Sequence, residues 1–242
     1  VNADADLNLD EQAKQKIKET RPLFCQTSDT LEALGKLARF QRLRSNAKIA
    51  AITGSSGKTT TRKILQEIFN TRFHTLATQG NLNNEIGLPL TLLNLSASHE
   101  WAVVEMGMNH PGELSRMSWI ARPDIAMVLN TAAVHLEGVG SIENVAKAKA
   151  EIFQGLGRGS TAVIFADDKQ RHILESLACE NRQIQNLLFF GSDPLADITL
   201  VNMICGPAAI DFKVEINGQA AGFTIPSPAR FMVNNCLGAI SI

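Results

Sequence analysis

A glycine-rich run between residues 54 and 60 offers the clearest chemistry in the sequence. It connects an apolar segment to a segment with helical spacing, in which Ile64, Leu65 and Ile68 fall on one face. Glycines allow the tight turn that aims backbone N–H groups at an anion, and the helix N-terminus adds the positive end of its dipole. This context predicts a phosphate loop for a nucleoside triphosphate, with an ordinary glycine turn as the alternative. The loop consists of Gly54, Ser55, Ser56, Gly57, Lys58, Thr59 and Thr60.

Two side chains of this loop have specific tasks in such a site. Lys58 neutralises the β- and γ-phosphates, and the Thr59 hydroxyl ligates Mg²⁺. The usual pattern G-x4-G-K-S/T is incomplete, because Ile52 stands at its first glycine position. We still expect nucleotide binding, since an apolar run precedes the loop and an amphipathic segment follows it.

A lysine inside an apolar stripe is the second candidate. In the segment 141–156, Lys149 occupies a position on the apolar face of a helix, whereas Lys147 points away toward Glu143 and Glu151. A buried ammonium is costly unless it is paired or neutralised. Lys149 therefore either extends to the surface or faces a site, as a cation or as a chemically modified group. The other members of the stripe are Ile142, Val145, Ile152 and Leu156.

Further polar residues follow two apolar runs. Glu105 ends the run WAVVE, and a carboxylate there is costly unless it meets a cation, which makes it a candidate metal ligand. Asn109 and His110 come shortly after it. His135 follows the next run, where it is either a functional group or an ordinary surface histidine. The polar residues 78–84 form either a plain loop or a surface for a polar substrate.

Alternating strands and helices must position these groups. We predict strands at 48–53, 101–106, 124–130 and 161–166, each an unbroken apolar run suited to a parallel sheet covered on both faces. Amphipathic helices are expected near 58–70, 85–95, 112–121, 141–156 and 168–179. This alternation predicts an α/β fold, a doubly wound and mostly parallel sheet flanked by helices. Ligands bind beyond the carboxyl ends of the strands in such sheets.

The segments before and after this region do not continue the alternation of apolar strands and amphipathic helices. Residues 30–43 have helical spacing, with Ser28 and Asp29 as N-terminal caps. After about residue 185 come the shorter runs LLFFG, ADITLVNMI, AIDFKVEI and AAGFTI, which predict a small antiparallel strand extension.

Composition narrows the class of protein. The 242 residues are 45% hydrophobic and 19% charged, enough for one large domain, or one domain with a fragment of another. The net charge of −1 gives no basic field for nucleic acid, and no apolar run is long enough to span a membrane. The four scattered cysteines suggest reduced thiols in a cytoplasmic protein. Because the chain starts at Val1 and stops within a helix-like segment, we expect a piece of a longer protein.

Five blocks of the sequence together resemble the Mur ligase family. They are TGSSGKTTT, TQGNLNNEIGLPLTLL, VVEMGMNHPGEL, NTAAVHLEGVGS and VAKAKAEIF, and the resemblance covers about residues 46–242. It implies three domains: a UDP-substrate domain, a central ATPase and a C-terminal domain. Residues 1–45 would then be the end of the first with its linker, residues 46–242 the central ATP-binding domain, and the third would be absent.

The resemblance also implies an activity. Family members use ATP and Mg²⁺ to phosphorylate a carboxylate, and an amine then attacks the acyl phosphate. The blocks QGNLNNEIG, GMNHPGE and HLEG narrow the expectation to addition of D-alanyl-D-alanine to UDP-N-acetylmuramoyl tripeptide, in peptidoglycan precursor synthesis. The alternatives are another ligase of the superfamily, acting on folate or a different muramoyl peptide, a phosphate-loop ATPase that gates a partner protein, and a truncated or degenerate chain that is no longer an enzyme. We expect a cytoplasmic monomer that turns over little as a fragment.

Residue roles follow from the same resemblance. Glu105 and His135 match ligands of a second Mg²⁺, and Lys149, four residues before Phe153, matches a carbamylated lysine that pairs with this ion. Asn235 matches an asparagine that meets adenine, although Pro228-Ala229-Arg230-Phe231 departs from the frequent Pro-Gly-x-His before it. The residues expected toward the substrates are Asn84, Asn109 and His110.

Overall fold

One mixed sheet organises the protein. The computed structural model describes residues 26–132 and 140–242, together with Gln12, Gln15, Lys16 and Glu19. Within these residues the strands are β1 (Lys48–Thr53), β2 (Thr75–Ala77), β3 (Trp101–Glu105), β4 (Ile125–Val128), β5 (Ser160–Phe165), β6 (Ile184–Gly191), β7 (Ile198–Cys205), β8 (Ile210–Ile216) and β9 (Gln219–Ile225). Their order in the sheet is β2-β3-β1-β4-β5-β6-β7-β8-β9. Neighbours are parallel from β2 to β7, and β8 and β9 are added in antiparallel pairing.

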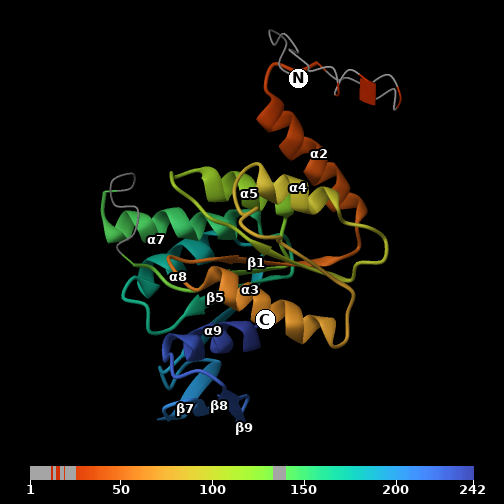
Figure 1. The fold of residues 1–242 in the computed structure, drawn as a ribbon. Helices are drawn as coiled ribbons and strands as arrows, with labels where there is room; N and C mark the ends of the chain where they lie inside the picture. Colours follow the sequence, from red (N-terminus) through yellow and green to blue (C-terminus); the bar gives the residue numbers. More distant parts are fainter. Residues whose placement is uncertain (1–11, 13–14, 17–18, 20–25, 133–139) are drawn as a thin grey trace.

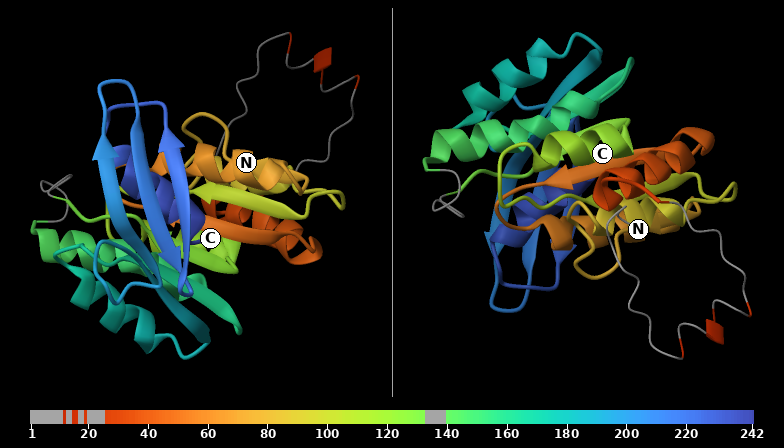
Figure 2. Two further views of the ribbon diagram at one scale, coloured as in Figure 1. Left: turned by 90° about the horizontal axis from the view of Figure 1, so that it is seen from below. Right: turned by 90° about the horizontal axis from the view of Figure 1, so that it is seen from above.

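Helices cover both faces of the parallel part (Figures 1 and 2). The helices are α2 (Thr30–Arg44), α3 (Lys58–Asn70), α4 (Gly87–Leu93), α5 (Glu113–Ala121), α7 (Ile142–Ala150), α8 (Arg171–Glu180) and α9 (Phe231–Ile240). A 3₁₀ helix, η1 (Glu151–Gly155), continues α7 directly. Residues of α3 and α9 share a core on one face, and residues of α2, α4, α5, α7, η1 and α8 share the core on the other.

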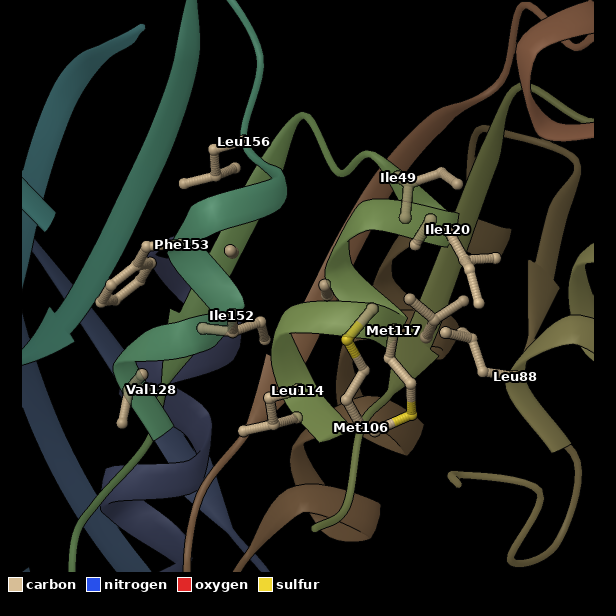
Figure 3. Packing of buried hydrophobic residues seen from close by; sticks show 14 of the residues in the cluster. Ile49, Leu88, Met106, Leu114, Met117, Ile120, Val128, Ile152, Phe153 and Leu156 are labelled. Atoms are coloured by element: carbon tan, nitrogen blue, oxygen red, sulfur yellow. The ribbon is translucent and has the colours of Figure 1, made fainter. Parts of the chain in front are cut away.

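The buried strand β1 explains why its sequence reads as an unbroken apolar run. Ile49 and Ala51 belong to the core on the α5 side, while Ala50 and Ile52 belong to the core on the α3 side, and all four are fully buried. Alternate side chains of a strand point to opposite faces, so a strand covered on both faces needs apolar residues at every position. Figure 3 shows side chains of the first core, including Leu114, Met117, Ile120, Ile152 and Phe153.

Most of the predicted elements are present. The four predicted strands and five predicted helices occur with ends shifted by a few residues, and Asp29 caps α2 by accepting a hydrogen bond from the Glu32 amide. The expected helix 141–156 changes to 3₁₀ geometry after Ala150. Strand β2 was not predicted, since three residues are too few to show a period of two.

One assignment from the sequence is wrong. The run LLFFG, residues 187–191, was expected in the antiparallel extension, yet it lies in β6, which pairs in parallel with β5. Only the last two residues of β6 are buried, so its sequence lacks the continuous apolar character of a central parallel strand. The antiparallel part is the meander of β7, β8 and β9. No helix in the described residues is long and apolar enough to cross a membrane.

Close packing of η1 against α5 generates a stability prediction. A Cβ at Gly155 would lie 2.2 Å from the carbonyl oxygen of Ser118, a backbone atom that cannot move aside easily. Gly155→Ala should therefore lower the free energy of unfolding by about 1–3 kcal/mol, measured by urea denaturation. Gly222→Ala is the control, because a Cβ at Gly222 on β9 meets nothing within 4 Å. Equal unfolding midpoints for the two variants would contradict this packing.

Candidate functional site

The phosphate loop lies at the carboxyl end of β1 and leads into α3. Gly57, the N-cap of α3, has φ 82°, a conformation that favours glycine, and a Cβ there would lie 2.3 Å from the Asn235 side-chain oxygen. Lys58 donates from Nζ to the Gly54 carbonyl at 2.8 Å. Burial lowers the pKa of Lys58, and the nearby Glu105 carboxylate opposes this effect. The loop thus combines a helix N-terminus with a partly buried cation, the features that bind phosphate.

Asn130 fixes the shape of the loop from the neighbouring strand. Its side-chain oxygen accepts a hydrogen bond from the Ser56 amide at 3.0 Å, and its side-chain nitrogen donates to the Ser56 carbonyl at 3.1 Å. Its backbone carbonyl accepts from the Ser55 amide at 3.0 Å. The sequence shows Asn130 only as a residue at the end of an apolar run, so this role was not predicted.

Glu105 lies beside the loop, as the sequence predicted, and is only 2% exposed. Its Oε2 accepts a hydrogen bond from the Thr59 hydroxyl at 2.9 Å, and its Oε1 accepts from the Asn83 side chain at 2.8 Å. Arg62 Nε lies 3.9 Å from Oε2, close enough for charge attraction. The cation that a buried carboxylate requires is therefore supplied in part by Arg62, a contact that the sequence analysis did not anticipate.

Lys149 is buried near Lys58 of the phosphate loop. It is 3% exposed, whereas Lys147 is exposed, which confirms the predicted face of α7. Burial and, as a smaller cause, the positive charge of Lys58 together lower the pKa of Lys149 to about 8. Among the described residues, no carboxylate pairs with Lys149. Lys149 therefore lies near a second cation, Lys58, without a paired carboxylate of its own within these residues.

A cavity of about 630 Å³ adjoins the loop on the α9 side. It is lined by residues of the loop, of the segment after β4 and of α9, among them Ser56, Thr60, Asn130 and Asn235. Asn235 is 4% exposed, and its side-chain nitrogen has no hydrogen-bond partner in the described part of the chain. An unpartnered buried donor beside a phosphate loop fits the hydrogen-bonding edge of a nucleotide base. Although the sequence before α9 departs from Pro-Gly-x-His, Asn235 still lies against Gly57 of the phosphate loop.

The remaining predicted residues lie in loops near Glu105. Asn84 accepts hydrogen bonds from the amides of Ile86 and Gly87, so its oxygen already serves the start of α4. Asn109 and His110 are exposed, and both bind Glu113 at the start of α5. Burial alone would raise the pKa of Glu113, but hydrogen bonds from the Asn109 amide and the His110 ring hold it below its usual value. His135 lies outside the described residues.

A residue that the sequence analysis left on the solvent side of its helix anchors this loop. Both side-chain oxygens of Glu151 accept hydrogen bonds from the Gly112 amide at 2.8 Å, and one also accepts from the Ser115 amide at 3.3 Å. Glu151 thus holds the first turn of α5 by the helix-end interaction that favours carboxylates. Its distance from residue 112 in the sequence hides this role from any local pattern.

The oxygen atoms at the loop fit a magnesium ion. Mg²⁺ prefers carboxylate, hydroxyl, phosphate and water oxygens, and the Thr59 hydroxyl and Glu105 carboxylate are adjacent. In residues 26–132 and 140–242, no group of three or more His, Cys, Asp or Glu side chains forms a ready-made metal centre. A cation here would therefore need further oxygens from a bound nucleotide.

Comparison with known proteins decides the family. The model of the Mur ligase middle domain matches residues 52–242. The chain belongs to the Mur ligase family. This result confirms the resemblance that the five sequence blocks indicated.

Named relatives of this Mur ligase chain agree with one another. It is 37% identical over 214 residues to a UDP-N-acetylmuramoyl-tripeptide--D-alanyl-D-alanine ligase of Escherichia coli, covering 88% of this chain and 47% of the relative. It is 32% identical over 213 residues to the ligase of that name from Bacillus subtilis, covering 88% and 44%. The chain spans about half the length of the curated relatives it matches.

Solved structures give the same result. MurF from Acinetobacter baumannii matches with a TM-score of 0.83 and 31% identity, covering 91% of this chain and 49% of that one. MurF ligase from Thermotoga maritima in complex with ADP matches with a TM-score of 0.80 and 28% identity, covering 90% and 49%. A folylpolyglutamate synthetase structure, at 12% identity and a TM-score of 0.64, shares the fold only.

The Asn130 contacts generate a prediction about nucleotide affinity. Asn130→Leu keeps the approximate size of the side chain but removes both hydrogen bonds to Ser56. We expect the affinity for ADP to fall about tenfold, since a looser loop must be ordered on binding. Calorimetric titration measures this change. Asn186→Leu, an exposed change on β6 outside the site, should bind as the parent does. Unchanged affinity in Asn130→Leu would show that Asn130 does not order the loop.

Proposed function

We propose that this chain is the ATP-binding part of a cytoplasmic, monomeric ligase that joins D-alanyl-D-alanine to UDP-N-acetylmuramoyl tripeptide. Residues 46–242 would form the central domain, and residues 1–45 the end of a UDP-substrate domain with its linker. The names of the relatives support the substrates, and the phosphate loop supports ATP. The near-neutral net charge gives no reason to expect a nucleic-acid partner.

Different residues at the site would bind different parts of the nucleotide. Amides of Gly54–Thr60 and the start of α3 would hold the β- and γ-phosphates, and Lys58 would turn from the Gly54 carbonyl toward them. Asn235 would meet adenine in the adjoining cavity. Thr59 would hold one Mg²⁺, and Glu105, His135 and a modified Lys149 would hold a second ion. Mg²⁺ supplies neutralisation of phosphate charge in such sites.

Chemistry would proceed in two transfers. A carboxylate oxygen of the muramoyl tripeptide attacks the γ-phosphorus, the bond to the β-phosphate oxygen breaks, and ADP leaves. The amine of D-alanyl-D-alanine then attacks the acyl phosphate, loses a proton, and the tetrahedral intermediate expels phosphate. Lys58 would stabilise negative charge on the transferred group, and the loop amides would keep it in line. Positioning and electrostatics would therefore provide most of the rate enhancement.

Lys149 is the residue that carries the proposal. An ordinary nucleotide switch has no use for a buried ammonium next to Lys58, which only adds repulsion. If the neutral amine attacks CO₂ and loses a proton, the product is a carbamate with one negative charge. This change replaces a repelling cation by an anion that attracts Lys58 and a metal ion. Asn84, Asn109 and His110 would face the substrates from the loops around Glu105.

Dependence on substrate is the direct test. The complete protein, supplied with ATP, Mg²⁺ and UDP-N-acetylmuramoyl tripeptide, should release ADP at least about tenfold faster when D-alanyl-D-alanine is added. Tetrahydrofolate with glutamate should not replace this pair. Rapid ATP hydrolysis without either substrate would instead support the phosphate-loop ATPase, and turnover with folate would support the other ligase.

Removal of the modified side chain tests the role of Lys149. Lys149→Ala should reduce ligase activity by roughly 100-fold or more, because an electrostatic group at the reaction centre is lost. Short carboxylic acids such as acetate should restore part of it by occupying the vacated space. Lys147→Ala, two residues away and exposed, should keep full activity. Full activity in Lys149→Ala would rule out the carbamate.

The carbamate itself should be visible by ¹³C NMR with labelled bicarbonate, in the parent and not in Lys149→Ala. Its signal should grow as the pH rises through about 8, the pKa of Lys149, because only the neutral amine reacts with CO₂.

A further inference from the structure

A basic cavity lies at the amino-terminal ends of the parallel strands, opposite to the phosphate loop at their carboxyl ends. It has a volume of about 260 Å³ and lies where β4 and β5 begin, and Arg42, Arg122, Arg158, Asp124 and Ser160 are among its lining residues. A strand of six residues is about 20 Å long, so this cavity is separate from the nucleotide site. Three guanidinium groups line it against one carboxylate.

Arg42 and Asp124 both have structural roles, because each binds other parts of the fold. Arg42 donates hydrogen bonds to the carbonyls of Ala121, Ala47 and Arg122, and to the Asp124 carboxylate at 3.0 Å. The same carboxylate oxygen accepts from the Ile49 amide at 2.8 Å. Arg42 therefore closes the C-terminal end of α5 and joins it to β1 and β4, and the charges of this pair offset each other.

Arg122 and Arg158 have no such task. In residues 26–132 and 140–242, neither guanidinium forms a hydrogen bond or an ion pair. Arg122 follows α5 with φ 43°, a left-handed conformation that is uncommon outside glycine, asparagine and aspartate. Its guanidinium lies next to Gly157, where an added Cβ would be 3.4 Å from Arg122 Nε. Strained backbone that places an unpaired charge often marks a functional position.

A buried hydroxyl at the same cavity also has no partner. Ser160 is 4% exposed, and its Oγ has no hydrogen-bond partner in the described part of the chain. A buried polar atom without a partner costs free energy unless a ligand or water satisfies it. The hydroxyl and the two arginines therefore lack partners at the same place.

We propose that this cavity binds a phosphate-class oxyanion through Arg122, Arg158 and Ser160. Planar guanidinium groups match the oxygens of such an anion in pairs, and charge-assisted hydrogen bonds are the strongest that a protein forms with it. Capping of a helix end explains the position of Arg42. It does not explain Arg122 and Arg158, whose guanidinium groups make no such contact in the described part of the chain. Burial first, and the positive charge of Arg122 as a smaller cause, lower the pKa of Arg39 and Arg42, and a bound anion would offset the repulsion by Arg122.

Hydrogen–deuterium exchange with inorganic phosphate as the probe tests this site. In the complete protein, peptides that contain Arg122 and Gly159 should exchange at least about twofold more slowly in phosphate than in chloride at equal ionic strength. The protection should saturate with a Kd on the order of 1 mM, typical of a few charge-assisted contacts. The peptide that contains Gly54–Thr60 reports separately on phosphate at the nucleotide loop.

Matched variants decide the assignment. Arg122→Asn with Arg158→Gln should abolish the protection, and Asn tolerates the left-handed backbone at position 122. Arg158→Gln alone, at an exposed loop position, should raise the Kd for phosphate about tenfold, and this single variant keeps the test decisive if the double variant unfolds. Arg72→Gln removes an exposed arginine outside the cavity and should change nothing. Protection that is equal in chloride, or that persists in the double variant, would overturn the proposal.

Two sources could supply the same oxyanion, a free phosphate or a lipid headgroup. Sedimentation with phosphatidylglycerol vesicles distinguishes them once phosphate binding is established. Retention that the double variant loses assigns the headgroup, and absence of retention assigns a free phosphate compound.

Discussion

Repulsion between two ammonium groups is the constraint on which the arrangement of the candidate active site depends. Burial lowers the pKa of both Lys58 and Lys149, and the positive charge of Lys58 lowers the pKa of Lys149 as well. Packing keeps them together, because Lys149 belongs to the buried face of α7 and Lys58 begins α3 directly after the central strand β1. An anion placed between them converts this unfavourable contact into an attractive one, which is why nucleotide phosphate and a lysine carbamate both suit the same place.

Asparagines supply much of the order around these charges. Asn130 holds the loop from β4, Asn83 orients Glu105, and Asn235 lies directly on Gly57. Neutral amides suit this position because they donate and accept hydrogen bonds without adding charge to the proposed nucleotide site. Their partners come from separate elements, so the loop is fixed by the sheet and by α9 rather than by its own sequence.

The sequence was sufficient for features that depend on local patterns. Unbroken apolar runs located β1 and β3, the glycine turn located the phosphate loop, and helical spacing placed Lys149 inward. Features that depend on distant contacts could not be predicted. Nothing near Glu151 indicates that it binds the Gly112 amide, and the parallel pairing of β6 depends on its neighbour β5 rather than on its own residues. His135 and the assigned roles of Asn84, Asn109 and His110 remain predictions.

The change from α to 3₁₀ geometry after Ala150 places Lys149 and Glu151 on one short turn. Lys149 lies near Lys58 of the phosphate loop. Glu151 accepts a hydrogen bond from the Gly112 amide at the start of α5, next to the loop that carries Asn109 and His110. A chemical change at Lys149 would therefore take place two residues from the carboxylate that anchors the start of α5.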